Sequence, residues 1–542
     1  MLTKFEHWRM CALNYKGWRR AFFAFLLGAF SVLALPPIHF VPALVPSFVG
    51  LIWMLDGSVT GPVRNWRYVI KQHIFNGAFA IGWWFGLGFF SAGLYWISFS
   101  FLVDAEQFAW MIPFALGGLS GSFAVYIGLV SALAFRLARP GLRRVIYFCV
   151  LWVVFEWVRG WLFTGFPWNF IGTIWTFNEE MIQFSSLSGV MGLSLMSIIA
   201  ASSVALLGYG HKSPCFRYCA AILPFAVLAL IWVGGFWRLA GTETQFVEDV
   251  RLRLVQPNIN QKDKWKFQLR GKHLNNLLEL SEGASHLADD KKPTHIIWPE
   301  TATPFFLDGN EAALRVVAAI SPPNGALLTG ALRRTGGEGT RVKLWNSLHV
   351  IGPDAKISAT FDKFHLVPFG EYVPLREYFY NFVNFEKLTA GRTDFSSGSG
   401  QRTIVVPGAP LVSPLICYEV IFSGGATSVA KEGQARPGWI LNITNDAWFG
   451  ASSGPYQHLA SAQLRAVEEG LPLVRVANTG ISAVIDGYGR IIKRSQLNER
   501  TYLDVALPKA LTNRTLFSRV KLFSLFILML GIILILRVRR LD

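Results

Sequence analysis

Cysteine is scarce in the sequence and unevenly distributed. Four of the five cysteines lie in the apolar N-terminal half, and only Cys417 stands in the polar part that follows. A disulfide within that polar part is therefore excluded, because it needs two thiols. Cys215 and Cys219 have the spacing of half a metal site, but two thiols without further cysteines are too few ligands. We interpret them as inert and expect no metal and no cofactor.

Acidic residues are also few. The chain has 34 Asp and Glu against 51 Lys and Arg, which gives a formal net charge of +17. A basic surplus of this size can indicate nucleic-acid binding, but these basic residues form no long tract and no nucleic-acid motif. Many of them lie between apolar stretches, where membrane topology accounts for them. We therefore expect no nucleic-acid partner.

Charged residues make up only 16% of the 542 positions, whereas 52% are hydrophobic and the mean hydropathy is +0.37. This composition excludes an ordinary soluble protein. Eight stretches are long enough, or nearly long enough, to cross a bilayer as helices. They lie at about 20–36, 40–56, 74–103, 108–135, 145–163, 184–209, 219–237 and 518–537. We predict a bundle of eight transmembrane helices.

The stretch between the seventh and eighth spans has the composition of a soluble domain and is long enough to hold its own core. We predict three parts: a membrane domain of seven helices at 1–240, a polar domain at 245–510, and a last transmembrane helix with a tail at 511–542.

Basic residues gather in alternate loops, and basic loops stay in the cytoplasm. On one side are Lys4, Arg9, Lys16, Arg19, Arg20, Arg64, Arg67, Lys71, Arg136, Arg139, Arg143, Arg144, Lys212 and Arg217. The loops around Pro36, Asp104 and Glu179 contain no Lys or Arg between the spans. Seven crossings from an inside N-terminus place the polar domain outside the cytoplasm, and the eighth returns Arg537, Arg539 and Arg540 inside.

The polar domain alternates strand and helix patterns, which indicates an α/β fold. We predict strands at 250–255, 295–298, 326–332, 344–351, 402–406, 411–417, 439–443, 474–477, 483–485 and 501–505, and helices at 274–287 and 457–469.

Cys417 follows a short apolar strand, where the turning chain presents a side chain to a cleft. A thiol attacks as the thiolate, and its ordinary pKa of about 8.5 means that it needs a neighbouring base or cation. A lone cysteine is otherwise a small core residue.

Two further residues have surroundings that suit catalysis. Glu300 ends an apolar strand, where hydrophobic walls raise the pKa of a carboxyl and suit proton transfer. Lys363 stands among aromatic and apolar residues, where an ammonium can stabilise an oxyanion. The alternatives are an exposed loop glutamate and a surface lysine.

The three residues stand in the motifs WPE at 298–300, DKFHLVPFGEYVP at 362–374 and ICYE at 416–419. In this order the motifs resemble the nitrilase superfamily of carbon–nitrogen hydrolases. Together with seven upstream spans and one downstream span, the chain resembles the apolipoprotein N-acyltransferase family over nearly its whole length. QPNINQ at 256–261 with Trp265, and GFPWN at 165–169, resemble that family too.

The resemblance implies an αββα sandwich and a Glu300–Lys363–Cys417 triad. It implies a ping-pong reaction in which Cys417 takes an acyl chain from a phospholipid and passes it to the N-terminal amine of a lipidated cysteine, the last step of lipoprotein maturation. Lys363 and the backbone N–H of Tyr418 would hold the oxyanion, while Glu371 and Glu419 would orient Lys363 or the second substrate. The implied location is the bacterial inner membrane, with the catalytic domain facing the periplasm.

Residues outside the triad leave alternatives open. Trp265 is a candidate substrate-binding residue. Glu156 and Arg159, three apart on one helical face, either bind a phospholipid head group or pair helices. Phe305, Phe306, Phe379, Phe382, Phe385, Trp448 and Phe449 form either mobile lids or plain core.

Two other functions compete with acyl transfer. A membrane-tethered amidase or nitrilase would keep the triad and use water, but it leaves the eight spans unexplained. A transporter or scaffold with a dead catalytic domain would have a broken triad, whereas all three residues are present.

Overall fold

The computed structural model describes residues 4–58, 77–210, 214–287, 291–336, 342–374, 393–428 and 435–538. The chain divides into two compact units. The first unit contains Met1–Ser98, Trp110–Ala240 and Arg519–Asp542, and the second contains Phe99–Ala109 and Gly241–Ser518.

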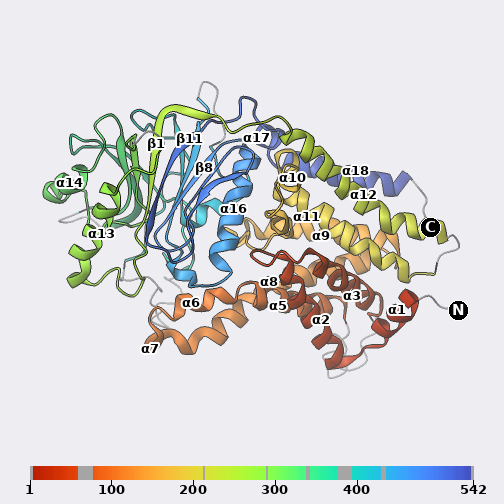
Figure 1. The fold of residues 1–542 in the computed structure, drawn as a ribbon. Coiled ribbons are helices and arrows are strands. Elements are labelled where there is room, and N and C mark those ends of the chain that lie inside the picture. The colour runs from red at the N-terminus through yellow and green to blue at the C-terminus, as the bar shows by residue number, and fades with distance from the viewer. Residues whose placement is uncertain are drawn as a thin grey trace. The chain divides into compact units, whose positions relative to one another are not determined.

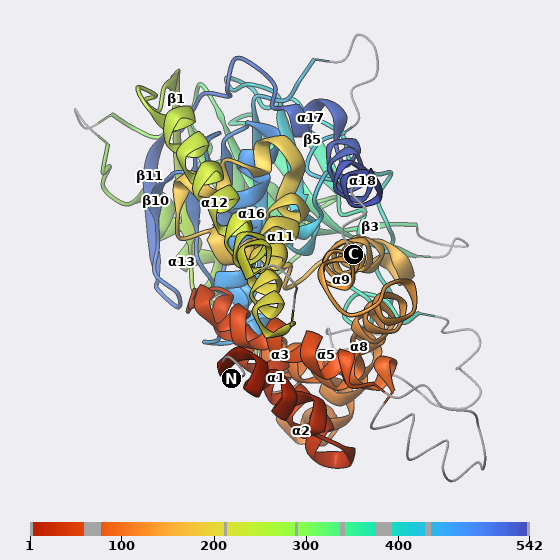
Figure 2. The ribbon, with the colours of Figure 1, turned by 90° about the vertical axis from the view of Figure 1, so that its right-hand side faces the viewer.

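The first unit is helical (Figures 1 and 2). Its main helices are α1 Lys4–Asn14, α2 Gly17–Ser31, α3 Leu44–Asp56, α5 Ala78–Gly93, α8 Ile112–Leu137, α9 Leu142–Arg159, α10 Glu179–Ile182, α11 Ser185–Ser203, α12 Pro214–Leu239 and α18 Phe523–Val538. Helix α5 packs against both α2 and α8, which lie beside it in Figure 2. Glycine permits the close approach: a Cβ at Gly28 of α2 would come within 1.9 Å of the Phe85 carbonyl oxygen of α5.

Four helices of the described chain are long and apolar enough to cross a membrane, namely Gly17–Ala34, Ala105–Leu137, Ser185–Gly208 and Pro214–Leu239. Ala78–Gly93 and Tyr95–Phe101, bent by 51°, make a fifth if they count as one span. Val41–Asp56 and Phe523–Leu534 are apolar but shorter. Helix α9 carries four charged residues, Arg143, Arg144, Glu156 and Arg159. These helices are consistent with a membrane protein, but the expected count of eight spans is not confirmed.

The second unit is built on two sheets. The six-stranded sheet has the order β11-β1-β2-β3-β4-β5, and the five-stranded sheet has the order β10-β9-β8-β7-β6. The strands are β1 Phe246–Gln256, β2 His295–Ile297, β3 Ala326–Thr335, β4 Lys343–Ile351, β5 Ile357–Asp362, β6 Val412–Ile416, β7 Trp439–Thr444, β8 Leu473–Ala477, β9 Ala483–Ile485, β10 Ile491–Arg494 and β11 Thr501–Pro508. Figure 1 shows α13 Arg270–Glu282 and α14 Glu311–Ala318 on one side of the strands and α16 Gly454–Glu469 on the other.

Successive side chains of the six-stranded sheet pack alternately into two hydrophobic cores, one on each face of the sheet. Leu254, Ile297 and Leu328 point toward the five-stranded sheet, where they pack in one cluster with Leu441 and Val476. Their neighbours Val255, Ile296 and Leu327 pack in a second cluster with Leu277 of α13 and Val317 of α14. Strands buried on both faces read as continuous apolar runs, which explains why the sequence pattern of this unit predicts them well.

Most of the predicted strands and both helices of this unit are confirmed. The helix predicted at 274–287 spans Arg270–Glu282 and ends before Gly283, and the strand predicted at 402–406 is wrong. That segment forms only an isolated bridge between Ile404 and Val412, and Pro407 follows it. The sequence pattern missed β5, β10 and α14.

A short distant segment, 99–109, completes the second unit. It includes α7 Ala105–Phe108, and α6 Ser98–Phe101 runs into it. The Ser100 hydroxyl donates a hydrogen bond to the Trp448 carbonyl at 3.0 Å. A Cβ on Gly450 would come within 2.4 Å of the Phe99 ring. Residues 448–450 therefore depend on this segment for their packing.

We expect Asp504→Ala to destabilise the second unit. Arg253 of β1 donates to both Asp504 carboxylate oxygens at 2.7 Å, and both side chains are buried. Removing the carboxylate leaves a buried unpaired cation, which costs about 3–5 kcal/mol of unfolding free energy. Denaturant unfolding of the purified protein in detergent measures the loss.

Asp354→Ala is the matched control, because Asp354 pairs with Lys356 at 3.7 Å on the exposed surface. Its effect should stay within about 0.5 kcal/mol. Equal effects of the two substitutions would contradict the expectation.

Candidate active site

The two sheets of the second unit bring Glu300, Lys363 and Cys417 to one edge. Strands β1, β2 and β3 are parallel, and β5 runs with them because two antiparallel pairings connect it to β3. Glu300 is the third residue after β2, Lys363 follows β5 directly, and Cys417 follows β6 directly. Carboxyl ends of strands are where α/β folds place their sites.

Lys363 is a buried ammonium between two carboxylates. Its Nζ lies 2.9 Å from Glu371 Oε1 and 3.8 Å from Glu300 Oε1, and its side chain is 1% exposed. Burial alone would lower the pKa of Lys363, but Glu371 and Glu300 outweigh this effect and raise it. The lysine therefore stays charged throughout the neutral range.

Asn346 of β4 bridges the two carboxylates and orients them. Its Nδ2 donates to Glu300 Oε1 at 2.7 Å and to Glu371 Oε1 at 3.3 Å. Glu371 Oε2 accepts a further hydrogen bond from the Val367 backbone at 2.8 Å. Burial raises the pKa of Glu300, although Lys363 acts against the rise. A carboxyl whose pKa is raised in this way is suited to proton transfer.

Cys417 occupies a tight elbow between β6 and the 3-10 helix η10 Cys417–Ile421. Its φ is +54°, a left-handed value that a residue with a side chain seldom adopts. Burial and the Glu300 carboxylate raise the pKa of the Cys417 thiol to about 12. At neutral pH the resting sulfur is protonated, so the cysteine needs a base to become a nucleophile.

Side chains of the five-stranded sheet and of helix α16 hold the elbow at Cys417 in place. Asn442 Nδ2 of β7 donates to the Cys417 carbonyl at 3.3 Å, and His458 Nε2 of α16 lies 3.2 Å from the same oxygen. Thr444 hydrogen-bonds to the Cys417 side chain. These contacts hold the strained backbone in place.

Glu419 connects the elbow to the loop that carries the lysine. One of its oxygens accepts from the backbone N–H groups of Phe364 and His365 at 2.8 and 3.0 Å, and the other accepts from Ile416 at 2.7 Å. Burial raises the pKa of Glu419 to about 7. The structure thus places Glu419 against backbone groups, where it fixes Lys363 and Cys417 relative to each other.

Lys264 is a second buried ammonium that the sequence did not single out. Its side chain is buried, and its Nζ donates to the Glu300 backbone carbonyl at 3.1 Å. Burial lowers the pKa of Lys264 to about 8, while Glu300 and Cys417 act to raise it. With Lys264 included, two ammonium groups balance the carboxylates of Glu300 and Glu371. The one sequence signal was its position beside Trp265.

Trp265 and four of the seven aromatic residues expected in lids lie within the described residues. Trp265 is half-buried in the turn that carries Lys264, and Phe305, Phe306, Trp448 and Phe449 are half-buried as well. Phe379, Phe382 and Phe385 lie outside the described residues.

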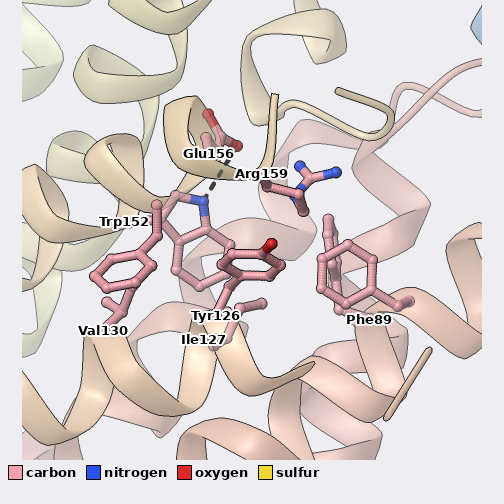
Figure 3. A pocket seen from close by; sticks show the side chains of 9 residues that line it. Phe89, Tyr126, Ile127, Val130, Trp152, Glu156 and Arg159 are labelled. Atoms are coloured by element: carbon pink, nitrogen blue, oxygen red, sulfur yellow. Dashed lines mark hydrogen bonds between the residues drawn. The ribbon is translucent and has the colours of Figure 1, made fainter. Parts of the chain in front are cut away.

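Glu156 belongs to the first unit, where it lines a small pocket (Figure 3). The other lining residues are Phe89, Phe90, Tyr126, Ile127, Val130, Trp152, Phe155 and Arg159. Glu156 Oε1 accepts from the Trp152 indole at 3.2 Å and from the Ile171 backbone at 3.0 Å. The carboxylate therefore anchors the turn η6 Ile171–Trp175 to α9.

Arg159 closes the loop that follows α9. Its Nη1 donates to the carbonyls of Phe166 and Trp168 at 2.6 and 2.7 Å, and the side chain is buried. The guanidinium lies near the rings of Phe90 and Phe170, at 5.2 and 5.3 Å from their centroids. These contacts hold the backbone of the GFPWN segment, residues 165–169, in its folded conformation.

The arrangement in the second unit suits acyl transfer. The protonated Cys417 thiol, the Glu300 carboxyl of raised pKa and the Lys363 ammonium stand at one strand edge and influence one another electrostatically, and the ammonium lies 3.8 Å from the carboxylate. The carboxylate can remove the thiol proton, and the ammonium can stabilise the negative charge that develops on a carbonyl oxygen.

Comparison with known proteins gives matches along most of the chain. Residues 27–203 match the apolipoprotein N-acyltransferase N-terminal domain, and residues 251–515 match the carbon–nitrogen hydrolase family. An apolipoprotein N-acyltransferase of Rhodopseudomonas palustris is 40% identical over 508 residues, covering 93% of this chain and 92% of that protein. One of Bradyrhizobium diazoefficiens is 39% identical over 526 residues, covering 96% and 95%.

We expect Lys264→Met to make Cys417 less reactive. The substitution removes one of two positive charges beside Glu300 and Cys417, so the pKa of both groups rises and less thiolate forms. One pKa unit corresponds to a tenfold change, so alkylation of Cys417 by iodoacetamide at pH 7 should slow about tenfold. The pH–rate curve should move to higher pH.

Mass spectrometry of the alkylated peptides follows each cysteine separately, and the exposed Cys11 serves as the internal reference. Lys264→Arg should restore most of the rate because it keeps the charge. If Lys264→Met and Lys264→Arg slow Cys417 equally, the lysine acts through packing and not through its charge.

Proposed function

The chain belongs to the apolipoprotein N-acyltransferase family, and from this premise we propose that Cys417 carries the acyl chain between two substrates. The donor is a phospholipid, and the acceptor is the N-terminal amine of a diacylated lipoprotein. The observation that carries the proposal is the buried Lys363 ammonium, 2.9 Å from Glu371 and 3.8 Å from Glu300, at the strand edge where Cys417 stands.

In the first half-reaction, Glu300 takes the thiol proton while the Cys417 sulfur attacks an ester carbonyl of the phospholipid. The carbonyl oxygen becomes an oxyanion, which Lys363 Nζ and the Tyr418 backbone N–H stabilise. When the tetrahedral intermediate collapses, the carbon–oxygen ester bond breaks and Glu300 returns the proton to the leaving lysophospholipid. A thioester remains on Cys417.

In the second half-reaction, the acceptor amine attacks the thioester carbonyl. Glu300 takes a proton from the amine, and the same two donors hold the second oxyanion. The carbon–sulfur bond then breaks, the new amide leaves, and the thiolate recovers its proton from Glu300. A thioester is activated enough to acylate an amine, and holding both reactants in place supplies much of the rate.

Supporting residues have positions that fit this scheme. Glu371 fixes the Lys363 ammonium, and Glu419 fixes the two loops that carry Lys363 and Cys417. We assign Trp265 to substrate binding, since it shares a turn with Lys264. The contacts of Glu156 and Arg159 favour structural pairing over direct binding of a phospholipid head group.

We also propose eight membrane spans, with the catalytic domain at 245–510 on the periplasmic side of the bacterial inner membrane. Contacts in the first unit support this topology. Arg144 and Arg9 both pair with Asp56, at 2.8 and 3.2 Å, and Arg217 pairs with Glu6 at 3.1 Å. The segments expected in the cytoplasm therefore lie together at one end of the bundle.

Incubation with phospholipid that bears a labelled acyl chain tests the mechanism. We expect the wild type to acquire a label that hydroxylamine removes, and Cys417→Ala to acquire none. Addition of a lipopeptide should move the label to its N-terminus as an amide. Label that leaves only as free fatty acid, even with lipopeptide present, would favour a hydrolase, and absence of label on the wild type would contradict the proposal.

Orientation is tested by cysteine labelling in intact cells. Ala312 is exposed on α14 of the second unit, so Ala312→Cys should react with a maleimide that enters the periplasm but does not cross the inner membrane. The native Cys11 should react only after the inner membrane is opened. The reverse pattern would contradict the topology.

A further inference from the structure

A cleft of the second unit lies at the same strand edge as Cys417. It encloses about 340 Å³. The lining residues are Asn258, Asn260, Gln261, Ala447, Gly450, Ala451, Thr479 and Asn498. They follow β1, β7, β8 and β10, so the cleft lies beyond the ends of strands other than those that carry the triad.

The lining has a distinctive chemistry. Four of its side chains are carboxamides, one is a hydroxyl, and the other three residues are Ala or Gly. Within the described residues, this lining contains no ionisable group to recognise a phosphate and no large apolar group to hold an acyl chain. Carboxamides donate and accept at once, as peptide groups do. Small residues allow a backbone to approach closely.

The geometry of the asparagines also suits a ligand site. Asn258 and Asn498 adopt left-handed φ values of +52° and +59°. The Asn258 amide donates to the Asn498 backbone carbonyl at 2.7 Å, which holds the two loops together across the cleft. Asparagine adopts this backbone conformation more readily than most residues that carry a side chain.

A chain of amides connects the cleft to the acyl-carrying cysteine. Gln261 is buried, and its Oε1 accepts from Asn445 Nδ2 at 2.8 Å. Asn445 also accepts from Asn478 at 2.9 Å, and it directly follows Thr444, which hydrogen-bonds to the Cys417 side chain. In the other direction, Gln261 begins the turn that carries Lys264. The turn that begins at Gln261 therefore lines the cleft and also carries the lysine that contacts Glu300.

We propose that this cleft binds the extended polypeptide backbone that follows the lipidated cysteine of the acceptor. The inference rests on the proposed function and adds a subsite to it. Of the two substrates, the acceptor is the one with peptide groups, and its chain must leave the site while its first residue meets the thioester. The cleft therefore serves the second half-reaction and has no part in the first.

Two acceptors and two half-reactions test the proposal. One acceptor is a diacylglyceryl cysteine amide, and the other is the same group followed by a short neutral peptide. Thioester formation from labelled phospholipid is measured first, and transfer to each acceptor is measured next. Ala451→Trp fills the cleft from an exposed position, and Asn498→Gly removes one carboxamide at a φ that glycine tolerates.

We expect the wild type to have a lower KM for the extended acceptor than for the short one. Asn498→Gly should raise the KM for the extended acceptor about two- to tenfold, the range of one lost hydrogen bond, and Ala451→Trp should raise it further. Both variants should form the thioester at the wild-type rate and use the short acceptor normally. Ala312→Trp, the same substitution on exposed α14, should change nothing.

The outcomes separate this inference from the function on which it rests. Failure of the wild type to form a thioester overturns the acyl-transfer mechanism itself. A normal thioester combined with equal KM values for the two acceptors, or with cleft variants that leave the extended acceptor unaffected, overturns the cleft alone.

Discussion

Burying the Lys363 ammonium is possible only because carboxylates stand beside it. An isolated ammonium in the protein interior would lose its hydration and shed its proton. Glu371 at 2.9 Å and Glu300 at 3.8 Å prevent this, and Asn346 holds both carboxylates. Every other element of the site serves this cluster: β5 delivers the lysine, β2 delivers Glu300, and Glu419 ties the lysine loop to the cysteine elbow.

The same cluster sets the resting protonation state of the Cys417 thiol. Burial and the negative charge of Glu300 raise the pKa of Cys417 to about 12, so the resting thiol keeps its proton at neutral pH. A permanently ionised thiolate would react with any electrophile. In the proposed reaction a protonated thiol reacts only when proton transfer and attack are coupled, which would limit side reactions.

Much of this organisation could be predicted from the sequence. Apolar runs predicted the strands of the two sheets because those strands are buried on both faces, and the motifs around Glu300, Lys363 and Cys417 predicted the family, which the relatives confirm. Asn346 and Lys264 could not be predicted, because an amide on β4 and a lysine in a turn look ordinary in the sequence until folding brings them to Glu300. The strand that positions Lys363, β5, was also missed: its residues alternate apolar and polar, but only Phe361 among them is buried, so the strand has no apolar run like those of the other strands.

The segment 99–109 belongs to the compact unit formed by 241–518, although more than a hundred residues separate them in the chain. A soluble fragment that starts at Gly241 would therefore lose the Ser100 hydroxyl that satisfies the Trp448 carbonyl and the Phe99 ring beside Gly450. A form of the second unit that is expressed by itself has to include residues 99–109, because this segment, although it lies among the N-terminal helices in the chain, is a structural part of that unit.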